Sequence, residues 1–440
     1  MKSFVKAWLG PQRWHVIRMR WWQLKRAVEI DHCAVQMPWF VKRDSPQLAF
    51  LNSLATRIDW DYAPHLEARL CLWLGAMFWP LGSCWHVMSA ARRFGAPVRA
   101  ASGISVGRQC LDMWILANRH NVPPLSYYQC RLFEPSRRRS LGSWIHYFEI
   151  CNLLPELNRD RPAHLLDDKD HFVRQIAALG LPGIPVVATF SQGRLDGERI
   201  QLPEGDLVLK PVDLCSGSRF ERWSFEAGRW SNGRQVLDAQ GLVAHCEERS
   251  REHRLVLQPR VFNHAALRPL AGNGLCTVRI VSGRPLRGSS VALFATLRMP
   301  TGSAMVDNFN AGGIAAPVDM GTGVLGSAVG RYLTSGVFDA HPTSGAPILG
   351  FQLPYWSDAV ALVLRSHDCF AWVPFVGWDI VIAPDGPHLL EANMTWSAEL
   401  LQLPHGQPLG STQFTPIYIE HYQSRGNSVS QAQLSSASGG

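Results

Sequence analysis

The sequence predicts an α+β protein with a mainly helical amino-terminal region. The first 155 residues contain long stretches without strand alternation, whereas short β-branched runs separated by Gly and Pro follow from about residue 165. Helical windows lie between some of these runs, as in a mixed domain. With 440 residues, 46% of them hydrophobic and 18% charged, the chain can bury a large core. We expect a helical region over 1–155, an α+β domain over 156–422 and a disordered tail over 423–440.

The amino-terminal region combines positive charge with aromatic side chains. Several Lys and Arg residues precede the first acid, Glu29, and Trp14, Trp21 and Trp22 lie among them. Residues 70–91 then form an apolar run that meets the ~20-residue length of a membrane span, although Gly and Pro interrupt it. A buried helical hairpin, peripheral contact with an anionic membrane and a true span therefore all stay open. We expect no nucleic-acid partner.

The ten cysteines are scattered, without a C-x-x-C pair or the spacing of a metal finger. This usage is typical of reduced thiols in a cytoplasmic protein, and we assign all ten a structural role. The tail from residue 423 is polar and poor in bulky side chains, which is why we expect it to be disordered.

Two acids and an amide gather near the end of the stretch "GWDIVIAPDGPHLLEANMTW", residues 377–396. If the central Pro-Asp-Gly-Pro forms a hairpin turn, Asp379 and Glu391 lie about equally far from it, and Asn393 shares a face with Glu391. An even register would pair Asp379 with Ala392, so a bulge or an odd loop is needed. Such oxygens suit a hard divalent cation; a turn-flanking Asp and a strand-capping Glu are the alternative.

Two lysines are candidates for contact with phosphate. Lys210 ends the apolar run "DLVLK" and precedes a loop of small residues that contains Ser216 and Gly217, where a cation and backbone amides can hold phosphate oxygens. The loop is not a Walker motif. Lys169 begins a predicted helix, where a positive charge is unfavourable unless an anion binds nearby. An ordinary surface lysine is the alternative in each case.

Further polar residues follow apolar strands. Gln258, Pro259, Arg260 and Val261 come after one strand and can present backbone groups to an adenine edge. Arg279 lies inside the strand "CTVRIVS", so its charge is either paired structurally or aimed at a bound anion.

Taken in order, these motifs resemble the ATP-grasp superfamily. They are D-K, V-L-K-P, Q-P-R-V, T-V-R, D-N-F-x-x-G-G, W-D-I and E-A-N. The chain is most similar to the branch of sugar-transfer-associated ATP-grasp proteins, which is related to the glutamate-adding ligases. The resemblance covers about residues 160–420 and matches the first 155 only loosely. It implies two α+β subdomains that enclose ATP.

The resemblance also implies roles for individual residues. Arg279 and Lys210 would act on the transferring phosphoryl group. The implied ATP-binding residues are Lys169, Lys210, Ser216, Gly217, Gln258, Pro259, Arg260, Val261 and Asn308, and the implied Mg²⁺ ligands are Asp379, Glu391 and Asn393. The loop C-S-G-S-R has less glycine than most of the superfamily, and Trp378 stands where several ligases have a basic residue nearby. These departures bear on loop closure and on the acceptor site.

The implied function is an ATP- and Mg²⁺-dependent ligase. A carboxylate would attack the γ-phosphate, and an amine or another nucleophile would capture the acyl phosphate; positioning and charge neutralisation suffice for the first step. The substrate would be a small metabolite or a precursor of a cell-surface glycan. The alternatives are a phosphotransferase that acts on a hydroxyl group and a membrane-associated ATP-binding protein without turnover.

Overall fold

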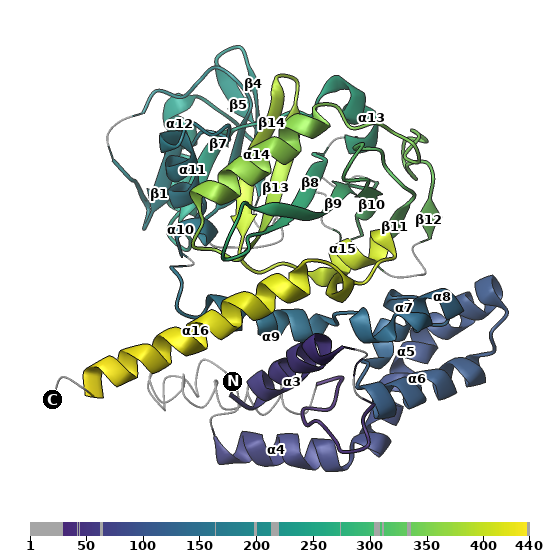
Figure 1. The fold of residues 1–440 in the computed structure, drawn as a ribbon. Helices are drawn as coiled ribbons and strands as arrows, with labels where there is room; N and C mark the ends of the chain where they lie inside the picture. The colour runs from purple at the N-terminus through teal and green to yellow at the C-terminus, as the bar shows by residue number, and fades with distance from the viewer. Residues whose placement is uncertain are drawn as a thin grey trace, which may run out of the picture. The chain divides into compact units, whose positions relative to one another are not determined.

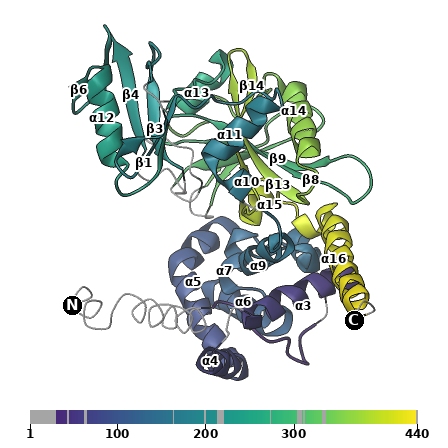
Figure 2. The same ribbon diagram turned by 90° about the vertical axis from the view of Figure 1, so that its left-hand side faces the viewer.

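The computed structural model describes residues 30–437, except 42, 44, 62–64, 163, 198–199, 213–219, 273, 303–308, 310–311 and 332–335. The basic segment before Glu29 and the predicted site residues Ser216, Gly217 and Asn308 lie outside the described residues. The chain divides into two compact units (Figures 1 and 2). The first contains the described residues up to Glu156 together with Ser397–Ile419; the second contains Leu157–Arg331, Gly336–Trp396 and the chain from Glu420 onward.

The first unit is helical, as the sequence predicts. Helix α5 ends at Gly103 and helix α6 at Asn121, and both of these residues adopt the left-handed conformation that commonly closes a helix. The Ser105 side chain caps the start of α6 by accepting a hydrogen bond from the Arg108 amide. The described helices are α3 (Pro46–Asp61), α4 (Leu66–Met77), α5 (Trp79–Ser102), α6 (Val106–His120), α7 (Pro124–Gln129), α8 (Pro135–Arg139), η1 (Leu141–Ser143), α9 (Tyr147–Asn158), α15 (Ala398–His405), η5 (Leu409–Ser411) and the start of α16 (Phe414–Ala437), which belongs to this unit as far as Ile419.

Helix α16 begins at Phe414 and continues through the polar stretch after residue 423 to Ala437. That the tail over 423–440 is disordered in solution stays a prediction.

Among the described residues, no single helix is long and apolar enough to cross a membrane. Helices α4 and α5 meet this criterion only as a pair, and the chain bends by 81° between them.

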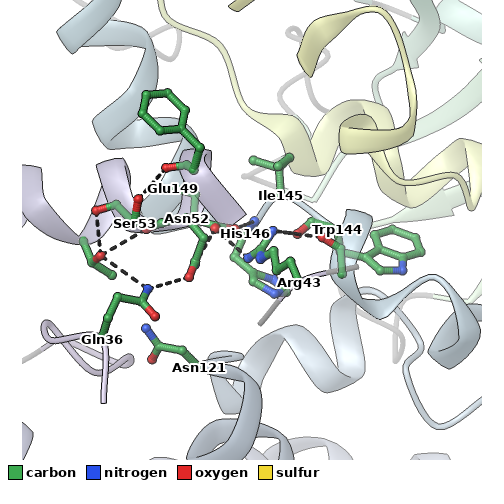
Figure 3. A network of polar contacts seen from close by, with 12 residues as sticks. Gln36, Arg43, Asn52, Ser53, Asn121, Trp144, Ile145, His146 and Glu149 are labelled. Atoms are coloured by element: carbon green, nitrogen blue, oxygen red, sulfur yellow. Dashed lines mark hydrogen bonds and ion pairs between the residues drawn. The ribbon is translucent and has the colours of Figure 1, made fainter. Parts of the chain in front are cut away.

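A buried polar network fixes the start of α9 (Figure 3). The Glu149 carboxylate, fully buried, accepts hydrogen bonds from Arg43 Nη2 at 2.6 Å, Asn52 Nδ2 at 2.9 Å and the His146 backbone amide at 2.8 Å. The bond from the His146 amide is one of the two hydrogen bonds of a capping box, because Glu149 is the third residue of the helix and His146 directly precedes the helix. A buried charge is tolerated here because it is both paired and hydrogen-bonded.

Gln402 connects the carboxyl-terminal segment to this unit. Its Oε1 accepts from the amides of Ile145 at 3.1 Å and Leu409 at 2.8 Å, and its Nε2 donates to the Ile145 carbonyl at 2.8 Å. One amide side chain thus satisfies three buried backbone groups, which explains why Ser397–Ile419 packs with residues far away in the sequence.

The second unit contains two seven-stranded antiparallel sheets, which confirms the predicted α+β class. The first has the order β2-β1-β7-β3-β4-β5-β6 and the second β12-β11-β10-β9-β8-β13-β14. The first sheet consists of β1 (Ala188–Ser191), β2 (Arg194–Leu195), β3 (Leu207–Pro211), β4 (Glu221–Glu226), β5 (Arg229–Ser231), β6 (Val236–Leu237) and β7 (Leu255–Pro259). The second consists of β8 (Thr277–Gly283), β9 (Val291–Met299), β10 (Ile314–Val318), β11 (Ala328–Gly330), β12 (Val337–Phe338), β13 (Phe375–Ala383) and β14 (Gly386–Asn393).

One face of each sheet is covered by helices. In Figure 2, α12 (Ala239–Arg249) lies against the first sheet, where Leu242 and Cys246 pack on Leu207, Trp223 and Leu257. The remaining helices of this unit are α10 (His164–Asp167), α11 (Lys169–Ala178), η2 (Ala265–Leu267), α13 (Arg268–Ala271) and α14 (Trp356–Cys369).

The second sheet packs against α11 and α14 through Phe172, Val363, Ile280 and Trp378. Because side chains alternate along a strand, Arg279 and Asp379 lie on the opposite face. The charged residues therefore lie on the face away from α11 and α14, where Arg279 and Asp379 are also buried.

A buried histidine reinforces the core of the second unit. His367 Nδ1 lies 2.7 Å from Ser282 Oγ and its Nε2 lies 2.9 Å from the Val373 carbonyl, while Trp378 Nε1 donates to the same Ser282 Oγ at 2.8 Å. Burial lowers the pKa of His367 to about 4. The imidazole is therefore neutral at pH 7, with one nitrogen donating and the other accepting.

We expect His367 to make the fold sensitive to acid. An unfolded histidine has a pKa near 6.5, so the stability from the neutral folded imidazole is fully present above that pH and is lost as the pH falls toward 4. The loss should be about 2 kcal/mol at pH 5. In urea titrations of His367→Gln, which keeps hydrogen-bonding groups but cannot titrate, the fall between pH 7 and pH 5 should be smaller by this amount. Equal falls in both proteins would contradict the assignment.

Candidate active site

The hairpin of β13 and β14 brings the two predicted acids opposite each other. Asp379 pairs with Glu391, and the register shifts between Asp379 and Ile380, so that Leu390 is the extra residue of a bulge. This confirms the prediction that a bulge or an odd loop is required. The bulge-free partner of Asp379 would have been Leu390 rather than the expected Ala392, because the loop between the paired residues contains only Pro384 and Asp385.

Asp379 is held by two arginines. Arg279 lies opposite it on β8 and donates through Nε at 2.5 Å and Nη2 at 3.0 Å, one bond to each carboxylate oxygen. Arg298 Nη2 lies 3.1 Å from Asp379 Oδ2 and also donates to Thr277 Oγ1. Burial alone would raise the pKa of Asp379, but the two guanidinium groups outweigh it and the pKa is lowered. Sequence reasoning missed Arg298, which no motif marks.

Lys210 and Glu391 line one pocket and carry opposite charges. Burial lowers the pKa of the Lys210 ammonium group; Glu391 and Asp379 oppose this effect, whereas Lys169 adds to it. The four side chains thus lie near enough to interact electrostatically. Within the part of the chain that the structure describes, the side chains of Lys210 and Glu391 have no hydrogen-bond or ion-pair partner.

The second predicted lysine lies at the first position of α11. Its ammonium group donates to the Val212 carbonyl at 3.2 Å. Asp168 caps the helix, and Arg254 pairs with Asp168 and Asp170 at 2.7 Å each, which fixes this helix start beside β7. Lys169 is thereby positioned next to the strand end that carries Lys210.

The residues at the end of β7 and directly after it have mixed roles. Gln258 Nε2 donates to the Ile184 carbonyl at 3.0 Å, and Arg260 pairs with Asp206 at 2.8 Å, so both side chains hold the protein together. The backbone of Val261, in contrast, is available to a ligand. Within the described residues, neither its amide nor its carbonyl has a hydrogen-bond partner. A planar ring with one donor and one acceptor on its edge fits such a backbone.

These residues border a pocket between the two sheets of the second unit. Its empty volume, counted together with the solvent at its mouth, is about 690 Å³. Strand alternation places Val208, Lys210, Arg222 and Gln258 on the face of the first sheet away from α12. The other lining residues are Ile184, Phe220, Pro259, Arg260, Val261, Gly274, Leu275, Leu390 and Glu391.

Sequence reasoning missed Arg222 and the apolar residues Ile184, Val208, Phe220, Leu275 and Leu390. The alternation of β3 would have indicated Val208, two residues before Lys210. Leu390 and Leu275 come from the second sheet, so only the folded chain brings them to the pocket.

The three predicted metal ligands are not equally available. Asn393 Nδ2 donates to the Gly377 carbonyl at 3.3 Å, which leaves its Oδ1 as an acceptor, and Glu391 is unpaired within the described residues. Asp379 Oδ2 accepts from both Arg279 and Arg298, whereas among the described residues Oδ1 accepts from Arg279 alone, so Oδ1 keeps one lone pair for a cation. No cluster of three or more His, Cys, Asp or Glu side chains gathers in the described ranges. The donor set therefore fits a hard cation only when other oxygens, such as those of phosphate, complete its shell.

Comparison with known proteins gives a family match. The family model described as sugar-transfer associated ATP-grasp matches residues 151–414. No curated protein matches the chain.

Solved structures that match the chain include D-alanyl-alanine synthetase A from Vibrio cholerae, with 8% identity, a TM-score of 0.34 and coverage of 59% of this chain and 65% of that one. The ATP-grasp ligase PsnB with a minimal precursor has 14% identity and a TM-score of 0.33, and the match covers 67% of this chain and 76% of that one. The L-amino acid ligase from Bacillus licheniformis has 11% identity and a TM-score of 0.34, and the match covers 58% of this chain and 48% of that one. The chain thus spans less than two thirds of the synthetase and of the L-amino acid ligase.

The two opposed acids should differ in their contribution to stability. Asp379→Asn leaves the buried Arg279 and the half-buried Arg298 without their counter-charge and should destabilise the protein by about 3–5 kcal/mol. Glu391→Gln removes a charge without a partner among the described residues and should change stability by less than about 1 kcal/mol. Chemical denaturation at pH 7 measures both. Similar large losses in the two variants would show that Glu391 also has a structural role.

Proposed function

We infer that this chain, which belongs to the sugar-transfer associated ATP-grasp family, is an ATP- and Mg²⁺-dependent ligase that joins a carboxylate to an amine or a related nucleophile. The observation that carries the proposal is the charged end of the pocket. There Lys210 and Glu391 have no partner within the described residues, beside an apolar pocket bordered by the backbone of Val261. Nucleotide phosphates and a cation would supply the missing partners.

In this proposal the adenine ring occupies the apolar end of the pocket. Its edge hydrogen-bonds to the backbone of Val261, and Val208 and Leu390 contact its faces. Lys210 and Lys169 bind the phosphates. The family resemblance adds Ser216, Gly217 and Asn308 to the proposed nucleotide contacts. Glu391 and Asn393 would hold Mg²⁺, with Asp379 as a further ligand; the cation would neutralise phosphate charge.

The reaction then requires little acid–base chemistry. A substrate carboxylate attacks the γ-phosphorus, the bond to the β,γ-bridging oxygen breaks, and ADP leaves with that electron pair. The amine attacks the acyl phosphate, loses a proton and expels inorganic phosphate. Arg279 would stabilise the charge on the transferring group through Nη1, which has no hydrogen bond within the described part of the chain.

The proposed substrate is a small metabolite or a precursor of a cell-surface glycan, and we place the reaction in the cytoplasm. The direct experiment incubates the full chain with ATP, Mg²⁺ and pools of carboxylates and amines, then measures ADP and product mass. ADP release that requires both substrates supports the ligase. Release with a hydroxyl substrate alone, and a product heavier by one phosphoryl group, would instead identify a phosphotransferase. No turnover with any pool would favour an ATP-binding protein without catalysis.

Nucleotide binding can be tested without knowing the substrate. If Lys210 pairs with phosphate oxygens, Lys210→Ala should weaken ATP binding by about 1.5–3 kcal/mol, the range for hydrogen bonds to charged groups. Adenosine, which lacks phosphates, should bind both proteins equally. Isothermal titration calorimetry provides both affinities. Val236→Ser, which alters an exposed side chain on β6, is a control. ATP bound equally well by Lys210→Ala would remove Lys210 from the site.

A further inference from the structure

Helices α4 and α5 expose apolar side chains where a water-facing helix normally carries polar ones. The exposed fractions are 80% for Leu66, 57% for Trp73, 73% for Leu81 and 71% for Trp85. Such a concentration marks an interaction surface, because scattered single apolar residues are normal but a continuous set is not. The remaining members of this apolar face are Leu70, Leu74, Met77, Phe78 and Met88.

The exposure follows helical periodicity and does not come from loose packing. In α5, Ser83, Val87, Phe94 and Val98 form one buried stripe. In α4, Ala68, Leu72 and Ala76 are buried, at intervals of four residues. Each helix therefore already packs against its unit through one stripe, and the apolar face is a second stripe that faces outward.

The outward stripe of α5 changes from apolar to basic along its length. Leu81, Trp85 and Met88 follow one another at helical spacing, and Arg92 continues the same stripe four residues later. Arg92 and Arg93 are both exposed. Glu67 is the one acid of residues 66–102, which also contain Arg69, Arg92, Arg93 and Arg99.

Helix α6 extends this surface. Trp114 Nε1 donates to the Pro80 carbonyl at 3.0 Å, which fixes the start of α5 against α6. The Trp114 ring remains 37% exposed, and Leu111 beside it 49%. Tryptophan is the side chain enriched where one end is apolar and the other end meets water, as at a membrane interface.

We propose that the α4–α5 pair docks on an anionic lipid bilayer, with the apolar face among the acyl chains and Arg92 and Arg93 at the level of the lipid phosphates. The arginines favour lipid over a second copy of the chain, because a symmetric dimer through this face would bring the arginines of both copies into one interface. The inference does not depend on the ligase proposal.

The test is cosedimentation of the full chain with vesicles of phosphatidylcholine, with and without phosphatidylglycerol. Binding should be stronger with the anionic lipid and weaker at high salt. Leu81→Ser combined with Trp85→Ser should lower partitioning into both vesicles at least about tenfold, because each side chain loses its apolar burial. Arg92→Ala combined with Arg93→Ala should lower it roughly tenfold or more for anionic vesicles alone.

A matched control keeps the experiment specific. Leu349→Ser removes an exposed leucine, 54% accessible, from the second unit and should bind vesicles as the parent does. The Leu81 and Trp85 side chains are mostly in water, so thermal melts of the double variant should match the parent. Unchanged vesicle binding by that variant would overturn the proposal. So would sedimentation equilibrium showing a dimer that the variant dissociates without any effect on lipid binding.

Discussion

The buried contact of Asp379 with Arg279 and Arg298 is the interaction on which the geometry of the candidate site depends. A carboxylate that is 4% exposed would be costly without counter-charges, and the two guanidinium groups come from neighbouring strands on one side of it. On the other side, the bulge at Leu390 sets Glu391 directly opposite. The pairing therefore satisfies Asp379 within the protein, while Glu391 remains available to a ligand.

Because side chains alternate along each strand, core residues and pocket residues lie on opposite faces of the two sheets. In the second sheet, Val278, Ile280, Trp378 and Ile380 belong to the core under the helices. The residues between them carry the charges. The same separation in the first sheet puts Leu207 and Leu209 under α12, and Val208 and Lys210 at the pocket. A substitution on the charged face can therefore alter binding with little effect on the core, except at Asp379.

Much of this arrangement could be predicted from short-range patterns. Helix α11 and helix α14 follow from apolar periodicity, the β13–β14 hairpin from its turn residues, and the need for a bulge from the positions of two acids. The remaining features depend on contacts between distant segments. Nothing near Arg298 in the sequence indicates that it shares Asp379 with Arg279, and Leu275 and Leu390 reach the pocket only when the second sheet has formed. Gln402 connects the segment after β14 to the helical unit by hydrogen bonds to the backbone of Ile145, and no side-chain pattern in the sequence indicates these bonds.

The central claim is that Glu391, and not the arginine-bound Asp379, is the charge that couples a cation to bound nucleotide. The most direct measurement is the affinity for ADP by calorimetry with and without Mg²⁺, in the parent and in Glu391→Gln. The account predicts that Mg²⁺ tightens ADP binding in the parent and that this gain falls at least about tenfold in the variant, the loss of one charge-assisted contact, while the affinity without Mg²⁺ does not decrease. An undiminished gain in Glu391→Gln would contradict the account.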